Sequence, residues 1–153
     1  MGIHQRKIQM KKIFLDTNVI VDLLLERKPW IDDIEKILTL YEFDVVEELN
    51  CASISLSTVF YLMSRAKISR DKIITKMKWF RTFCHVTSVG ENIFDSALDS
   101  QFDDLEDAMQ YFSALKGKCD VIITRNKKDF AESKIQVLEP QEFLDSFCKE
   151  MGE

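Results

Sequence analysis

Short apolar segments alternate with amphipathic segments along almost the whole chain. Two of the short segments, KKIFL at 11–15 and VIIT at 121–124, have the aliphatic and β-branched composition of buried strands. Elsewhere apolar residues recur at helical spacing, for example at positions 73, 74, 77, 80 and 83. Strands that alternate with helices pair in parallel, because each crossover helix returns the chain to the same end of the sheet. We therefore predict a three-layer α/β/α fold with a central, mainly parallel sheet.

Capping residues and apolar periodicity predict the bounds of the elements. We expect strands at 11–15, 52–56, 85–89, 121–126 and 135–138. We expect helices at 17–27, 30–49, 57–65, 69–83, 91–100, 103–117 and from Pro140 onward. Ser69 and the Asp103-Asp104 pair are the expected N-caps, Gly117 follows a helix end, and Pro140 takes a first helical position.

A chain of 153 residues, 46% of them apolar, suits one globular domain, which we expect at 10–150 behind an N-terminal extension at 1–9. Four Gly and two Pro are too few for a disordered chain. The apolar runs are too short to cross a bilayer and no signal peptide is evident, so we expect a cytoplasmic protein without a membrane partner. The four cysteines form no CxxC pair, which favours reduced, mostly buried thiols over a zinc site.

The net charge of −5 argues against a generally basic nucleic-acid-binding surface and directs attention to the acidic residues. Asp16 ends the first strand, Asp104 and Asp107 begin a helix, and Asp129 follows the VIIT strand. Sites in open parallel sheets form at the carboxyl ends of strands, where these residues would meet. Converging carboxylates repel one another unless they are protonated or bind a hard cation. Oxygen-only ligands favour Mg²⁺ or Mn²⁺ over zinc.

Most of these acidic residues also have a structural explanation. Asp16 and Asp104 can each cap the helix that follows, and Glu106 suits the first turn of a helix. Asp129 fits an ordinary turn, whereas Asp107 lies deeper in its helix, where capping is poor. As site residues we rank Asp16 and Asp107 first, then Asp104, Asp129 and Asn126, and last Glu106 and Asp120, the latter at the amino end of its strand.

The order of these segments resembles the PIN domain family. IFLDTNVIVDLL at 13–24 is similar to the opening of that domain and places its first acidic residue at Asp16. DLEDAMQ at 104–110 resembles the helix with a later acidic residue, here Asp107. DVIITRNKKDF at 120–130 and VLEPQEFL at 137–144 resemble its final acidic loop and its C-terminal strand and helix.

The resemblance implies a metal-dependent ribonuclease fold, found in toxins of toxin–antitoxin pairs and in RNA-processing nucleases. Asp16 and Asp107 would bind Mg²⁺ or Mn²⁺, and Asn18 and Thr124 would orient the ligands or the attacking water. The substrate would be single-stranded or structured RNA.

The chain departs from the family pattern at two acidic positions. Thr58 is nearest to the place of a glutamate at the start of the helix after the second strand, and Asn126 replaces the last acid. Asp104 and Asp129 are the expected substitutes, and Thr58 becomes a supporting residue. The expected metal ligands are then Asp16, Asp107, Asp104 and Asn126, and the expected catalytic acids are Asp16, Asp107, Asp104 and Asp129. Each neutral replacement removes a negative charge and weakens metal affinity.

Basic residues flank the expected acidic site. Arg125, Lys127 and Lys128 are the predicted phosphate contacts. Seven more form a band over two helices that is also typical of a solvated surface: Arg65, Lys67, Arg70, Lys72, Lys76, Lys78 and Arg81.

Besides the nuclease, two hypotheses stay open. One is a PIN fold with a weakened metal site that binds nucleic acid or protein. The other is a toxin held by an antitoxin protein through exposed apolar surface at 30–83; a homodimer is common in the family. Dehalogenase-type phosphatases are disfavoured because Asn18 stands where their second acid is required, and response-regulator receivers because the N-terminal acidic pair is missing.

Overall fold

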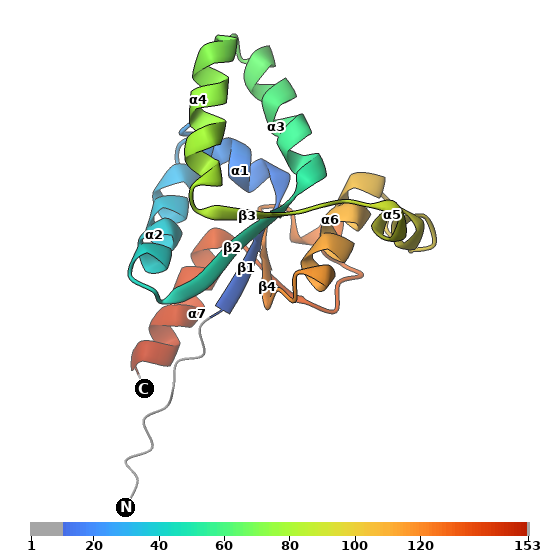
Figure 1. Ribbon diagram of the computed structural model, residues 1–153. Coiled ribbons are helices and arrows are strands. Elements are labelled where there is room, and N and C mark those ends of the chain that lie inside the picture. Colours follow the sequence, from blue (N-terminus) through green and yellow to red (C-terminus); the bar gives the residue numbers. More distant parts are fainter. Residues whose placement is uncertain (1–10, 153) are drawn as a thin grey trace, which may run out of the picture.

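A five-stranded parallel sheet forms the centre of the molecule (Figure 1). The computed structural model describes residues 11–152, and side chains for 11–149; the expected extension at 1–9 lies outside this range. The strands are β1 (Lys11–Leu15), β2 (Val46–Ala52), β3 (Cys84–Thr87), β4 (Val121–Ile123) and β5 (Gln136–Leu138), in the order β3-β2-β1-β4-β5. The predicted parallel α/β fold is confirmed.

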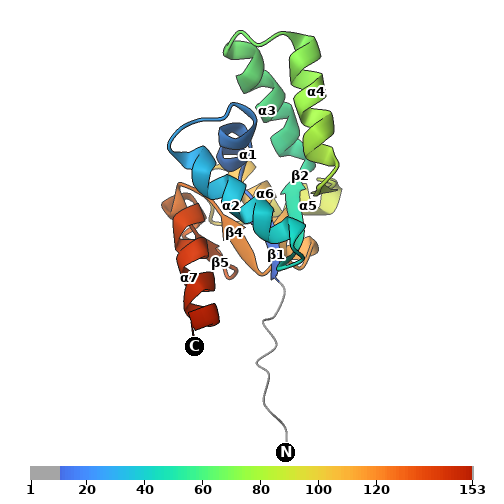
Figure 2. The ribbon, with the colours of Figure 1, turned by 90° about the vertical axis from the view of Figure 1, so that its left-hand side faces the viewer.

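Helices cover both faces of the sheet. They are α1 (Thr17–Leu24), α2 (Trp30–Glu42), α3 (Ser53–Arg65), α4 (Arg70–Arg81), α5 (Glu91–Leu98), α6 (Leu105–Lys116) and α7 (Pro140–Gly152), with a 3₁₀ turn η1 (Lys127–Phe130). Ile13 and Leu15 pack into the larger core beneath α1, α2, α3, α4 and α7, whereas Phe14 between them packs toward α6. Figure 2 shows α2 and α7 side by side on the face of the sheet from which Ile13 and Leu15 point.

The strand order creates a switch point beside β1. From β1 the chain moves outward through β2 and β3, and it later returns to the other side of β1 to form β4 and β5. Crossovers that leave in opposite directions open a crevice at the carboxyl ends of the two central strands. Asp16 and Thr124, which directly follow β1 and β4, therefore come together at this crevice.

Two predicted segments are wrong. The expected helix at 30–49 ends at Glu42, and residues from Val46 onward form β2, so the strand expected at 52–56 lies too late. Asp44 has a positive φ of 58°, a left-handed conformation that Asp tolerates and that ends the helix without a glycine. Helix α3 accordingly begins at Ser53, before the expected cap at 57–58.

Several local predictions are confirmed. The Ser69 side chain accepts a hydrogen bond from the Lys72 amide at the start of α4, and α7 begins at Pro140. All four cysteines are free thiols, three of them buried. Within the described residues, no helix is long and apolar enough to span a membrane.

A buried ion pair ties the loop after β4 to α1. The Asp22 carboxylate is fully buried and accepts from Nε and Nη2 of Arg125, at 2.6 and 3.2 Å. The Arg125 guanidinium carbon also lies 4.0 Å from the centroid of the Trp30 ring. Arg125 therefore fixes the start of α2 and the loop beside the crevice.

Replacing Arg125 by Ala should lower the free energy of unfolding by about 3 kcal/mol, because it leaves the buried Asp22 carboxylate without its main partner. Urea denaturation followed by circular dichroism measures the change. The exposed Lys128, also in this loop, is the matched control, and its replacement by Ala should cost less than about 0.5 kcal/mol. Equal stability of the two variants would contradict a structural role for Arg125.

Candidate metal-binding active site

Asp16 lies at the carboxyl end of β1 and is only 4% exposed. Although it occupies the N-cap position of α1, its side chain makes no capping hydrogen bond. Its Oδ2 instead accepts from Thr124 Oγ1 at 2.8 Å, across the ends of β1 and β4. Burial raises the pKa of Asp16 despite this hydrogen bond, and the nearby Glu106 carboxylate raises it further. Capping thus does not account for the placement of Asp16.

Glu106, on the first turn of α6, reaches into the same crevice. Its Oε1 accepts from Thr17 Oγ1 at 3.0 Å, and its Oε2 accepts from Thr58 Oγ1 at 3.1 Å. The carboxylate therefore joins α1, α3 and α6. The sequence placed Glu106 among the least favoured site residues, because a first-turn acid is sufficiently explained by the helix dipole.

Two polar residues in this network were not singled out from the sequence. Gln110 is buried, and its Oε1 accepts from the Thr17 amide at 3.1 Å and from Ser55 Oγ at 3.3 Å. Ser55 is also buried and lies 2.8 Å from Thr17 Oγ1. The sequence spacing could have indicated Gln110, because it follows Glu106 by four residues and so lies on the same face of α6.

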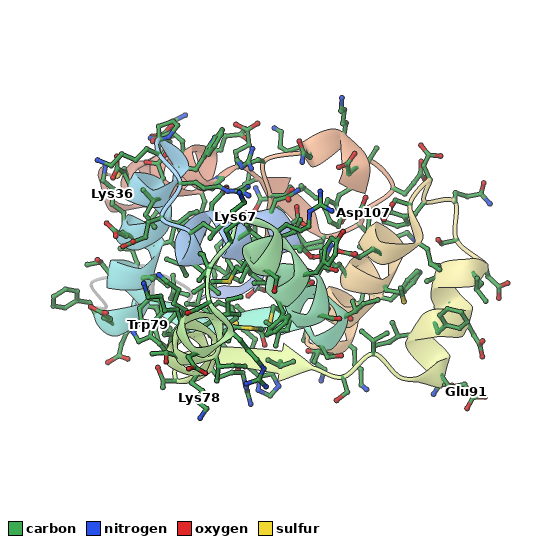
Figure 3. All side chains as sticks on the ribbon, turned by 90° about the horizontal axis from the view of Figure 1, so that it is seen from above. Lys36, Lys67, Lys78, Trp79, Glu91 and Asp107 are labelled. Carbon is green, nitrogen blue, oxygen red and sulfur yellow. The ribbon has the colours of Figure 1, made fainter. Side chains whose placement is uncertain are left out.

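Asp104 and Asp107 lie together at the N-terminus of α6. Asp104 is exposed, and its Oδ1 accepts from the Asp107 amide at 2.9 Å, so Asp104 caps the helix as the structural explanation predicts. Asp107 is half-buried on the crevice side, and Figure 3 shows it near the middle of the molecule as seen from above.

Close negative charges act on Asp107. Burial, followed by the charges of Asp104, Asp16, Asp129 and Glu106, raises the pKa of Asp107 to about 7. Four neighbouring acids, Glu106 among them, thus contribute negative charge at Asp107.

The loop after β4 contributes the other predicted residues. Thr124 Oγ1 accepts from the Asn126 amide at 3.0 Å, so one hydroxyl holds both Asp16 and the loop. Asn126 is half-buried, and Asp129 is exposed on η1. Asn18 is half-buried in the first turn of α1.

The three predicted phosphate contacts differ in their surroundings. The Arg125 guanidinium is engaged by Asp22 and Trp30. Lys127 Nζ pairs with Glu142 on α7 at 3.0 Å, and Lys128 is exposed on η1. Of the three, Lys128 is the one most open to an incoming anion.

The donor set fits a small hard cation. Asp16 and Asp107 offer carboxylate oxygens, and Asn126 an amide oxygen. Within residues 11–149, no three His, Cys, Asp or Glu side chains are placed to enclose a metal ion. Mg²⁺ does not need such enclosure, because it usually keeps several waters and binds proteins through one or two carboxylates.

The PIN domain family matches residues 12–128 of the chain. The chain belongs to the PIN domain family, which confirms the resemblance seen in its sequence. It is also 32% identical over 143 residues to Ribonuclease VapC1 of Aquifex aeolicus, an alignment that covers 88% of this chain and 94% of that protein.

Solved structures share the fold. One is a chain of VapBC2 from Rickettsia felis bound to a promoter DNA fragment, with 12% identity, a TM-score of 0.63 and coverage of 84% of this chain and 98% of that chain. Another is a chain of a toxin–antitoxin complex from Klebsiella pneumoniae, with 19% identity, a TM-score of 0.63 and coverage of 84% and 97%. At these identities the comparison supports the fold alone.

In the presence of EDTA, replacing Asp107 by Asn should raise the free energy of unfolding by about 1 kcal/mol at pH 8, and the melting temperature by about 3 °C. The folded-state pKa of about 7 lies above the ordinary 3.8, so ionisation costs stability as pH rises between these values. The gain should therefore be smaller at pH 4.5. Scanning fluorimetry measures the melting temperature of each variant, and Asp95→Asn, at an exposed position on α5, is the control. An unchanged melting temperature of Asp107→Asn at pH 8 would contradict crowding of negative charge at Asp107.

Proposed function

We propose that the protein is a ribonuclease that hydrolyses RNA phosphodiester bonds with the help of Mg²⁺ or Mn²⁺. The observation that carries the proposal is the buried Asp16 carboxylate at the switch point of a PIN domain, held by Thr124 across the ends of β1 and β4. The 32% identity to Ribonuclease VapC1 supports the same class of activity. A cytoplasmic location is part of the proposal.

In this proposal, Asp16 and Asp107 are the principal metal ligands. Asn126 adds a neutral oxygen, Asp129 adds negative charge, and Asp104 acts mainly through its cap on α6. When bound, the cation would lower the pKa of a coordinated water and offset charge on the phosphate.

The remaining residues set the geometry. Thr124 holds the Asp16 carboxylate, so the oxygen that faces the crevice has a fixed direction. Asn18, half-buried in the first turn of α1, would orient the attacking water or a metal ligand. Thr58 holds Glu106. Lys128 contacts the phosphate of the RNA, whereas Arg125 keeps the loop in place.

The first test is cleavage of a labelled RNA by purified protein with Mn²⁺. We expect EDTA to abolish cleavage. Asp16→Asn should lower the cleavage rate at least about a hundredfold, because loss of a metal ligand should cost more than loss of a residue that only supports a ligand. Asp95→Asn, an exposed aspartate on α5, is the matched control and should leave the rate unchanged. Cleavage that persists equally in EDTA and in Asp16→Asn would contradict the proposal.

We also propose an antitoxin protein as the partner, in a complex that contains a homodimer of this chain. A cleft of about 680 Å³ lies between α1, α2 and α4, within the region where we expect exposed apolar surface. Leu23, Leu24, Ile31, Leu38 and Trp79 line it, and Trp79 is 49% exposed. The toxin–antitoxin complexes among the structural neighbours support this kind of partner.

Co-expression with a small protein encoded beside the gene tests this partner. The complex should survive size-exclusion chromatography and suppress RNA cleavage. Trp79→Asp should weaken the inhibition by about tenfold or more, since a buried aromatic anchor often dominates an interface. Phe43→Asp, which is 75% exposed but does not line the cleft, is the control. Equal effects of both variants would exclude the cleft as the binding site.

A further inference from the structure

We propose that Tyr61 and Arg65, on α3, bind single-stranded RNA outside the crevice: Tyr61 stacks on a base, and Arg65 contacts a phosphate. The inference rests on the proposed function and names the form of RNA that the protein takes. It depends on three observations: the charge of the hairpin formed by α3 and α4, the exposed Tyr61 ring, and the position of both side chains relative to Thr58.

Positive charge is concentrated on the α3–α4 hairpin. The whole chain has a net charge of −5, but residues 53–81 contain seven Lys and Arg and one acid, Asp71, for a net charge of +6. The ion pairs of residues 11–149 include none with these seven side chains. Figure 1 shows α3 and α4 rising together above the sheet. An acidic chain thus presents a basic surface on one hairpin, where a polyanion is attracted.

The Tyr61 ring is presented to solvent on this hairpin. It is 57% exposed, and Arg65 donates from Nη1 to its hydroxyl at 3.4 Å. The Arg65 guanidinium carbon lies 5.9 Å from the ring centroid. This contact across one turn stabilises α3 slightly, yet both side chains remain exposed. An aromatic ring beside an arginine is the combination that stacks bases and binds phosphates in proteins that hold single strands.

The two side chains lie on the face of α3 that begins at the crevice. Tyr61 and Arg65 follow Thr58 by three and seven residues, so all three share one face of the helix. Thr58 donates to Glu106, and Glu106 also accepts from Thr17, the residue directly after Asp16. At 1.5 Å of rise per residue, Arg65 lies about 10 Å beyond Thr58 along the helix. An RNA strand with a phosphate in the crevice can therefore continue along this face.

Single-stranded RNA fits this surface better than a duplex or a protein does. Stacking on Tyr61 needs an unpaired base, because the bases of a duplex are stacked on one another. Residues 53–70 contain no Asp or Glu that would repel a phosphate. The cleft that we propose for the antitoxin is lined by Trp79 and not by Tyr61 or Arg65, so the two partners have separate surfaces.

Fluorescence anisotropy of a short labelled single-stranded RNA tests the stacking role, with the full-length protein in EDTA to stop metal-dependent cleavage. Tyr61→Leu should weaken binding about tenfold, as loss of one base-stacking side chain does. Tyr61→Phe keeps the ring and should bind as the wild type does. Phe94→Leu, at an exposed aromatic residue of α5, is the matched control and should also bind normally. Thermal melting confirms that each variant is folded.

The salt dependence of the same binding tests Arg65. Arg65→Gln should lower the slope of log affinity against log salt by about one phosphate contact. Lys78→Gln is the matched control, because Lys78 is exposed on α4 and lies far from Asp107 in Figure 3, and it should keep the wild-type slope.

Wild-type affinity in Tyr61→Leu, an equal loss in Tyr61→Phe, or a wild-type slope in Arg65→Gln would overturn the assignment. Absence of RNA binding by the wild type would overturn it as well. Wild-type protein that binds RNA as described but does not cleave it with Mn²⁺ would instead overturn the proposed function.

Discussion

The hydrogen bond from Thr124 to Asp16 joins the ends of the two central strands, and the arrangement of the site depends on it. It spans 108 residues of sequence and forms only because β4 pairs in parallel with β1. The same Thr124 oxygen accepts from the Asn126 amide, which sets the loop that follows. A buried carboxylate is thus held in one direction by the sheet itself, and the ion pairs of residues 11–149 include none with Asp16.

The energetic cost of this arrangement lies in the crowding of negative charge. Glu106 and Asp107 on α6 and Asp16 at the end of β1 carry negative charges that act on one another where burial weakens their hydration. Elsewhere a buried negative charge is balanced by a direct ion pair, because the Asp22 carboxylate contacts the Arg125 guanidinium. Asp22 therefore serves the fold, whereas Asp16 and Asp107 are the carboxylates for which we propose a bound cation.

The sequence predicts the sheet, most helices and the position of Asp16 at the end of a strand, because β-branched runs and strand-end aspartates are local signals. It fails at β2, whose polar Glu47, Glu48 and Asn50 interrupt the apolar run expected of a buried strand. It does not predict the hydrogen bond between Thr58 and Glu106, because that contact depends on how α3 packs near α6, and no local pattern reports that packing. Tertiary contacts therefore decide the residues that the motifs leave open.

The most direct test of the account is a crystal soaked in Mn²⁺ and measured for anomalous scattering. The account predicts a strong peak in the crevice between the Asp16 and Asp107 carboxylates, at about 2.0–2.2 Å from their oxygens, as oxygen ligands of small divalent ions require. In Asp16→Asn the peak should vanish. A wild-type crystal with no peak in this crevice, or with Mn²⁺ bound only elsewhere, would contradict the claim that these carboxylates form a metal site.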